Sequence, residues 1–245
     1  MGEYELKHFD DAASLARSVA GDWLEFVSTC PKDSPFCVAV SGGRIAPVVF
    51  AAFAARVKTE GGDLGSVHFF WSDERCVPPS SPESNFRAAW EQLLAPLQVP
   101  ERQIHRIQGE LPPGAATEQA AAALRAVCDA EAPNTPSLQL VLLGMGEDGH
   151  VASLFPGESD ALVKDPLIYR AVTASKPPPL RVTLSYSAIA AACDVWVLVS
   201  GEGKGAALSR SLEQGDTPLG RVLSLRQNTR IYSDLTHLEK KPRMT

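Results

Sequence analysis

The sequence predicts a three-layer α/β fold with a mostly parallel sheet, and two observations carry this prediction. Short apolar runs alternate with segments whose apolar residues recur at helical spacing. Strands that are separated by helices form parallel sheets covered by helices on both faces. The chain has 245 residues, enough for one core, and the alternation is not broken by a linker, so we expect a single domain over residues 1–245.

The individual elements follow from these patterns. Five apolar runs are predicted strands, at residues 36–40, 67–71, 138–144, 194–201 and 229–233. Apolar residues at helical spacing, or high helix propensity, predict helices around 15–26, 49–57 and 86–97 and at 115–130 and 203–213. Asp10 or Asp11 is placed to cap the first helix, and Pro47 lies near the start of the second, where proline is favoured.

The composition excludes several classes of protein. Hydrophobic residues at 44% and charged residues at 21% are ordinary for a soluble globular protein, and the formal net charge of −6 argues against nucleic-acid or anionic-membrane partners. No apolar run approaches the roughly 20 residues that a membrane helix needs. The amino-terminal residues lack the pattern of a secretory signal, so we expect a cytoplasmic protein. The five cysteines are scattered without CxxC spacing, which predicts neither a disulfide framework nor a metal site.

The first motif is SGGR at residues 41–44, directly after a predicted buried strand and before a helix. Its two glycines allow a sharp turn that exposes N–H groups near the positive end of the helix, which suits a phosphate. The motif matches neither a Walker A loop nor GxGxxG, so alone it is equally well explained as a plain tight turn.

Two further motifs follow predicted strands. WSDERCVPPSSPESNF (71–86) places Asp73, Glu74 and Arg75 at a strand end, although such a triplet is usually a solvated loop. GMGEDGH (144–150) holds Asp148 and His150 on a glycine-rich turn. A histidine there can take a proton from water near neutral pH, and a nearby carboxylate can fix its tautomer or orient the water. The alternative without a catalytic role is that Asp148 caps the turn and His150 is a surface residue.

Cations are the third feature. Lys176 and Arg181 flank the proline run of SKPPPLRVTLS (175–185), and Lys204 lies in GEGKG (201–205) at a strand-to-helix junction. Ligands of open parallel sheets bind beyond the carboxyl ends of the strands, and all of these motifs are expected there. Cations at that place suit a dianionic phosphate. Each of them is, taken singly, more often a solvent-facing residue.

Together, the motifs resemble the 6-phosphogluconolactonase family, within the group that includes glucosamine-6-phosphate deaminases. The resemblance covers nearly the whole chain, in order, through VSGG, WSDER, SNF, LLGMGEDGHVASLFPG, KPPPLRVTLS, VLVSGEGK and PLGRVL. It implies a modified Rossmann-like fold of the sugar-phosphate isomerase/deaminase-like type. The implied activity is hydrolysis of 6-phospho-D-glucono-1,5-lactone to 6-phosphogluconate, a cytosolic step of the pentose phosphate pathway that needs no metal or cofactor.

The resemblance also implies roles for residues. His150 is expected to be the general base that activates water, with Asp148 orienting His150 or the water and Arg75 contacting the substrate or the charge on its carbonyl oxygen. The phosphate is expected against Ser41, Gly42 and Gly43, with cations drawn from Arg44, Lys176, Arg181 and Lys204. Family members often read SGGSTP at the first turn, where this chain reads SGGRIAP, so Arg44 either binds the phosphate bidentately or points into solvent.

Two rival functions remain open at this stage. The deaminases continue from their D-G-H turn as I-A-F-N-E-P, with a catalytic glutamate, whereas this chain continues VASLFPG without one. Their second loop also carries a Tyr-containing run in place of SDER. A non-catalytic sugar-phosphate sensor on the same fold should lose the base, yet His150 and Asp148 are both present. The sequence leaves monomer and homodimer open.

Overall fold

The computed structural model of the chain describes residues 2–128 and 137–235. Its strands are β1 (Glu3–His8), β2 (Phe36–Val40), β3 (Val67–Trp71), β4 (Asp73–Arg75), β5 (Leu140–Gly144), β6 (Tyr169–Thr173), β7 (Leu180–Leu184), β8 (Asp194–Val199) and β9 (Asn228–Ser233). Its α-helices are α1 (Ala12–Thr29), α2 (Ala46–Glu60), α3 (Asn85–Ala89), α4 (Pro113–Val127), α5 (Asp160–Val163), α6 (Tyr186–Ala191), α7 (Gly205–Glu213) and α8 (Pro218–Ser224). A π-helical turn η1 (Trp90–Leu94) and two 3₁₀ turns, η2 (Glu101–Gln103) and η3 (Glu202–Lys204), complete the described elements.

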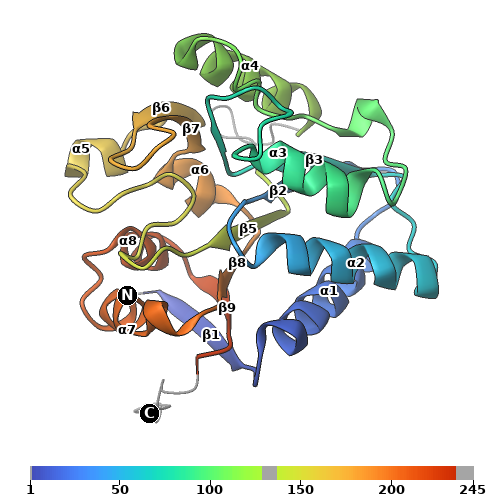
Figure 1. Cartoon of the computed structure of the whole chain (residues 1–245), viewed down its shortest axis with the longest axis horizontal. Helices are drawn as coiled ribbons and strands as arrows, with labels where there is room; N and C mark the ends of the chain where they lie inside the picture. Colours follow the sequence, from blue (N-terminus) through green and yellow to red (C-terminus); the bar gives the residue numbers. More distant parts are fainter. Residues whose placement is uncertain (1, 129–136, 236–245) are drawn as a thin grey trace.

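The central sheet confirms the predicted fold class. Six strands pair in parallel in the order β1-β9-β8-β5-β2-β3. Helices α1 and α2 cover one face, and α7 and α8 lie on the other (Figure 1). The middle strands are buried along almost their full length, as expected for a sheet that is covered on both sides.

A second, smaller sheet was not predicted. Its three antiparallel strands have the order β4-β7-β6, and α4 packs against β6 and β7 (Figure 1). These strands are hard to recognise because β4 has only three residues, all of them charged, and the predicted 175–180 loop is a proline-rich connection between two short strands. The DER triplet is therefore not a solvated loop: Asp73 and Glu74 are buried.

Most predicted element boundaries agree with the structure. Asp11 is the residue that caps α1, since its carboxylate accepts from the Ser14 N–H at 2.6 Å. The strand predicted at 194–201 ends at Val199, because Gly201 turns the chain with a φ of 102°. The segment 86–97 is not one regular helix but α3 followed by η1. Helix α4 ends at Val127, and residues 129 and 130 of the predicted 115–130 helix lie outside the described residues.

The order of the strands determines where a ligand can bind. From β2 the chain crosses to β3 on one side, whereas from β5 it crosses to β8 on the other. Loops that leave neighbouring strands in opposite directions leave a crevice between them at the carboxyl ends of the strands. The turns after β2 and β5, which carry SGGR and GMGEDGH, form the two sides of this crevice.

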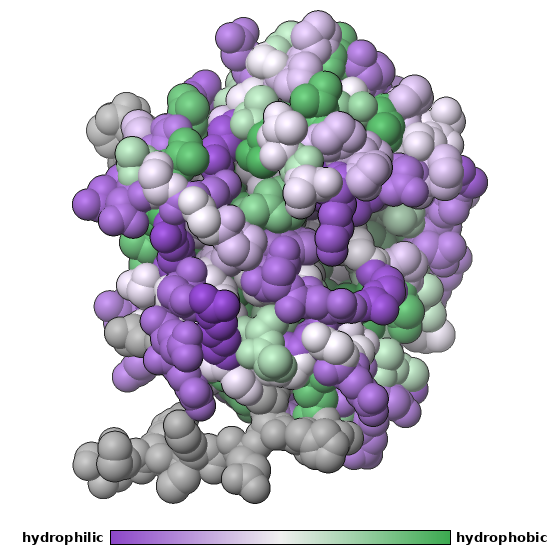
Figure 2. Space-filling view, turned by 60° about the vertical axis from the view of Figure 1, so that its left-hand side comes forward, coloured by the Kyte–Doolittle hydropathy of each residue, from purple (hydrophilic) through white to green (hydrophobic). Residues whose placement is uncertain are grey.

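The outer surface is mostly polar on the face that Figure 2 presents, with hydrophobic residues scattered rather than gathered into one broad patch. None of the five cysteines, all of which lie within the described residues, forms a disulfide. Among the described residues, no helix has the length and apolar composition required to cross a membrane.

Candidate active site

The crevice between β2 and β5 contains a cavity of about 80 Å³. It brings together eight of the ten residues that were predicted for the site: Ser41, Gly42, Gly43, Arg44, Arg75, His150, Arg181 and Lys204. A ninth, Asp148, lies behind His150 and contacts its ring. Lys176 is exposed in the connection between β6 and β7 and does not line the cavity, so its role in phosphate binding stays a prediction.

His150 and Asp148 are joined by a short hydrogen bond. His150 Nδ1 lies 2.5 Å from Asp148 Oδ1, and the same oxygen accepts from the backbone N–H of His150 at 3.2 Å. Burial disfavours the charged carboxylate, but the charge of His150 and these hydrogen bonds outweigh it and lower the pKa of Asp148. An ionised carboxylate only accepts, so Nδ1 carries the proton in this contact, and in the neutral tautomer of the ring the lone pair is on Nε2.

The turn that holds this pair requires its glycines. Gly149 has a φ of 80°, in the region that favours glycine, and the Gly146 N–H donates to the His150 carbonyl at 2.9 Å. A Cβ on Gly146 would lie 2.1 Å from the His150 ring, so the imidazole packs directly on the backbone. The turn therefore restricts the position of the histidine before any ligand arrives.

Phe155 packs against the other side of the histidine. The two ring centroids are 5.2 Å apart, and the Arg181 guanidinium lies 5.6 Å from the centroid of the same phenyl ring. Phe155 also occupies the place of the glutamate in the deaminase pattern I-A-F-N-E-P. An apolar ring, and no carboxylate, is therefore the neighbour of His150 at this place.

The SGGR turn presents polar groups that have no partner in the described part of the chain. The Ser41 hydroxyl is buried without a hydrogen bond, and no side chain caps the first turn of α2. Gly42 fits only because it has no side chain, since a Cβ there would lie 1.9 Å from Asn85 Oδ1. A buried hydroxyl without a partner, next to a helix start that no side chain caps, favours an anion.

Lys204 supplies a buried positive charge beside this turn. Its side chain comes from η3, after β8, and the residue is 6% exposed. Burial and the nearby charge of Arg44 lower the pKa of Lys204, while Asp234 and Glu147 oppose the shift. The ammonium group makes no hydrogen bond or ion pair with any residue that the structure describes.

Arg75 and Arg181 form a second pair of cations. They face each other across β4 and β7 in the antiparallel register, and like charges directly opposite destabilise a sheet. Burial, with the charge of Arg75, lowers the pKa of Arg181. Arg75 Nη1 donates to the Glu83 carbonyl at 2.6 Å, whereas its buried Nε–H has no partner among the described residues.

Sequence reasoning missed a buried acidic network below the cavity. Asp73, which lines the cavity, accepts from the Ser153 hydroxyl at 2.6 Å and from the Asn85 amide at 3.2 Å. Glu74 accepts from three backbone N–H groups and from the Ser84 hydroxyl; burial nevertheless raises its pKa. The SNF motif was the available signal, because Asn85 is its central residue and joins α3 to the cavity.

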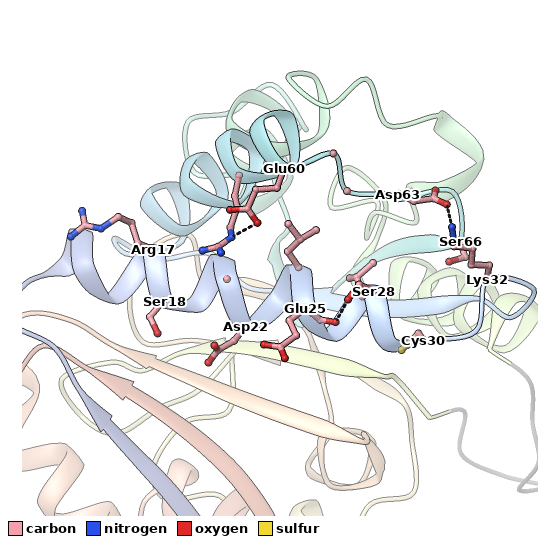
Figure 3. Close-up of a pocket in the computed structure, with 16 residues that line it drawn as sticks. Arg17, Ser18, Asp22, Glu25, Ser28, Cys30, Lys32, Glu60, Asp63 and Ser66 are labelled. Carbon is pink, nitrogen blue, oxygen red and sulfur yellow. Dashed lines mark hydrogen bonds and ion pairs between the residues drawn. The ribbon is translucent and has the colours of Figure 1, made fainter.

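A larger hollow, of about 710 Å³, lies between α1, the end of α2 and the segment that leads to β3 (Figure 3). It is at the opposite end of α2 from the cavity, and none of the predicted site residues lines it. Four of its charged side chains pair with one another: Lys32 with Asp63, and Arg56 with Glu60, each at 3.1 Å. No group of three or more His, Cys, Asp or Glu side chains suited to a metal ion occurs within residues 2–128 and 137–235.

Comparison with known proteins agrees with this arrangement. The family described as glucosamine-6-phosphate isomerases/6-phosphogluconolactonase matches residues 10–231. The chain belongs to this family. Within it, the 6-phosphogluconolactonase of Mycobacterium tuberculosis is 35% identical over 213 residues, covering 75% of this chain and 85% of the relative.

Comparison with solved structures extends the likeness to three dimensions. A structure described as devB protein is 30% identical, with a TM-score of 0.85 over 94% of this chain and 96% of the other. The 6-phosphogluconolactonase of Thermotoga maritima is 27% identical, with a TM-score of 0.75 over 94% and 99% of the two chains. The resemblance inferred from the motifs is thus confirmed at the level of family and fold.

Proposed function

We propose that the protein hydrolyses 6-phospho-D-glucono-1,5-lactone to 6-phospho-D-gluconate, the lactonase step of the oxidative pentose phosphate pathway. The observation that carries the proposal is the His150–Asp148 pair, which lies at the edge of a cavity lined by four cations and one carboxylate. The names of the M. tuberculosis and T. maritima relatives support the same activity.

His150 is the general base. Because its Nδ1–H is bound to Asp148, the Nε2 lone pair takes a proton from water as the water oxygen attacks the lactone carbonyl carbon. The resulting imidazolium is stabilised by the Asp148 carboxylate and returns the proton to the ring oxygen when the carbon–oxygen bond breaks. Water is thus added across one ester bond, and no covalent intermediate is formed with the protein.

Arg75 stabilises the negative charge that develops on the carbonyl oxygen. Its buried Nε–H has no partner in the described residues, so the group is free to donate to an oxyanion. Arg181, opposite it on β7, adds a second positive charge. A six-membered lactone already hydrolyses in water, so one base, worth about 10²–10⁴-fold, together with these donors is sufficient chemistry.

The phosphate group binds at the other side of the crevice. Ser41, the glycine backbone and the start of α2 offer donors, while Lys204 and Arg44 supply positive charge. The net charge of the whole chain is −6, so this local concentration of cations is what selects an anionic substrate. Binding the distant phosphate positions the lactone carbonyl near His150.

Two features disfavour the rivals. Phe155 stands where a deaminase carries its catalytic glutamate, so that reaction would lack a carboxylate. A silent sugar-phosphate sensor has no use for a histidine whose tautomer is set by a short hydrogen bond. The wider setting completes the proposal: one domain over residues 1–245, acting in the cytoplasm on a small substrate as a monomer or homodimer, without a cofactor or a nucleic-acid or membrane partner.

The direct test is hydrolysis of freshly prepared 6-phosphogluconolactone, with the spontaneous rate subtracted, by the wild type, His150→Ala and His8→Ala. We expect a large excess rate for the wild type and a loss of about 10²-fold or more in His150→Ala, because the base is removed. His8→Ala is the matched control, since His8 is an exposed histidine at the end of the edge strand β1, and it should retain full activity.

A wild-type rate equal to the background would refute the lactonase assignment. In that case, titration with phosphorylated sugars separates a binding protein from an inactive preparation, and release of ammonia from glucosamine 6-phosphate tests the deaminase. Equal rates for the wild type and His150→Ala, both above background, would retain the activity but exclude His150 as the base.

A further inference from the structure

Glu147 is an acidic residue next to the proposed phosphate site, although it does not line the cavity itself. It lies between Gly146 and Asp148 on the turn after β5, and its Oε1 pairs with Arg44 Nη2 at 3.1 Å. The two residues are 103 positions apart in sequence, so the ion pair joins the two sides of the crevice. An acid in this position opposes the binding of an anion.

Glu147 also reaches the third turn of the site. A Cβ on Gly203 would lie 3.2 Å from Glu147 Oε1, which shows how closely the carboxylate approaches the η3 segment beside Lys204. Its charge is one of the influences that favour protonated Lys204. One carboxylate therefore lies between two cations that come from different strands, Arg44 after β2 and Lys204 after β8.

The Arg44–Glu147 pair is easily broken. The two side chains are 75% and 62% exposed, and ion pairs in such settings contribute little to stability. A dianionic phosphate carries more charge and can bind an arginine through two parallel hydrogen bonds, so it outcompetes a single carboxylate. No other described residue pairs with Arg44, which leaves its guanidinium free to turn once Glu147 is displaced.

We propose that Glu147 acts as an internal competitor for the substrate phosphate, sets its affinity, and regains Arg44 when the product leaves. The inference rests on the proposed function, because it requires a phosphate between Arg44 and Lys204. Glu147 touches neither the reacting atoms nor the phosphate; it acts through Arg44 and is a specificity-determining residue. It also combines the two alternatives for Arg44: the guanidinium pairs with Glu147 in the described structure and would turn to the phosphate when the substrate binds.

The test compares Glu147→Gln with the wild type by calorimetric titration of inorganic phosphate at low ionic strength. We expect the variant to bind phosphate about three- to tenfold more tightly, because a competing carboxylate and its repulsion are both removed. The difference should shrink as salt is added. Glu60→Gln is the matched control, since Glu60 forms a similarly exposed ion pair with Arg56 at the other end of α2, about 21 Å along the helix axis.

Steady-state kinetics and a second variant separate this role from a merely structural one. Glu147→Gln should lower the KM for the lactone without raising kcat, and the effect on phosphate affinity should be smaller in an Arg44→Met background. A structural defect would raise KM or reduce kcat instead.

Three results would overturn the inference. Equal phosphate affinity in the wild type and Glu147→Gln excludes competition, and weaker binding by the variant means that Glu147 holds Arg44 in a productive position. If neither protein binds phosphate, the phosphate site of the proposed function fails and the inference fails with it. Loss of hydrolysis in His150→Ala is independent of all three, so failure of the competitor role is distinguishable from failure of the lactonase assignment.

Discussion

At the scale of single residues, the decisive arrangement is the contact between Asp148 and His150. Only two positions separate them, and the glycine turn folds them so that one carboxylate oxygen meets both the ring and the backbone N–H of the histidine. The same oxygen thus fixes the position of the imidazole and its tautomer. A carboxylate elsewhere in the fold is not needed for this task.

Asp148→Asn tests whether the Asp148 carboxylate sets the tautomer of His150. An amide of the same shape can donate to Nδ1 and so favour the tautomer with its proton on Nε2, which cannot act as a base. We expect kcat for lactone hydrolysis to fall by about 10²–10⁴-fold, with little change in the free energy of unfolding. Asp216→Asn, which alters an exposed carboxylate paired with Arg210, should leave kcat unchanged. An Asp148→Asn enzyme with wild-type kcat would show that the hydrogen bond does not set the tautomer.

At the scale of elements, the site depends on close packing between the turn after β2 and the start of α3. Asn85 approaches Gly42 so closely that no side chain fits there, and the same amide donates to the Asp73 carbonyl at 2.8 Å and to its carboxylate. The SGGR turn, the small sheet and α3 are therefore positioned against one another through one asparagine.

Gly42→Ala should disrupt this packing. The added methyl group would displace Asn85 from Asp73, so we expect a loss of about 1–3 kcal/mol in the free energy of unfolding and a raised KM for the lactone. Gly114→Ala is the control, because a Cβ on that α4 glycine meets nothing within 4 Å and alanine favours a helix. Chemical denaturation gives the free energy of unfolding of the wild type and of both variants. If Gly42→Ala is as stable as the wild type, Asn85 moves aside without an energetic cost.

At the scale of the whole molecule, a pair of histidines links stability to pH. His68 Nδ1 lies 2.9 Å from His105 Nε2, and the His105 ring stacks on Phe70 with centroids 4.5 Å apart. Burial, with the charge of His68, lowers the pKa of His105 from 6.5 to about 4. Burial also lowers the pKa of His68, with a contribution from Arg102. Both rings are therefore neutral in the folded protein at neutral pH.

The sign of the pH dependence follows from this shift. The unfolded chain takes up the His105 proton near pH 6.5 and the folded chain only near pH 4, so the stability that neutral His105 contributes is lost as the pH falls between these values. His105→Gln keeps hydrogen-bonding capacity without titrating, and its unfolding midpoint in urea should fall less steeply over that range than that of the wild type. Parallel profiles would show that His105 titrates alike in both states.

Much of the larger sheet could be predicted from the sequence, because its strands are continuous apolar runs with a helix or turn signal at each end. The runs 36–40 and 67–71 coincide with β2 and β3. The strand β1 alternates exposed and half-buried residues, and its hydrophobic signal is correspondingly weak. In the small sheet, charged residues occupy buried strand positions because partners far along the chain satisfy them, as Ser153 does for Asp73. A single sequence gives no sign of such partners.

The candidate site was predictable to a similar extent and for a similar reason. His150, Asp148 and the SGG turn lie at strand ends within recognisable motifs, whereas Glu147 reads as one more surface acid until its pairing with Arg44 is seen. Arg181 was expected in a loop beyond a parallel strand, but it reaches the cavity from β7 of the antiparallel sheet. The position of Arg181 follows from the pairing of β4 with β7, which local patterns do not reveal.

Because the chain crosses in opposite directions from β2 and β5, the cavity forms only when distant parts of the chain have come together in the sheet. The turns that surround the cavity are separated by about a hundred residues, and Lys204 joins them only after β8 has added to the sheet. A fragment that ends before β8 therefore lacks Lys204, one of the cations that line the cavity. An anion that binds this site therefore stabilises the assembled sheet as a unit rather than one local segment of it.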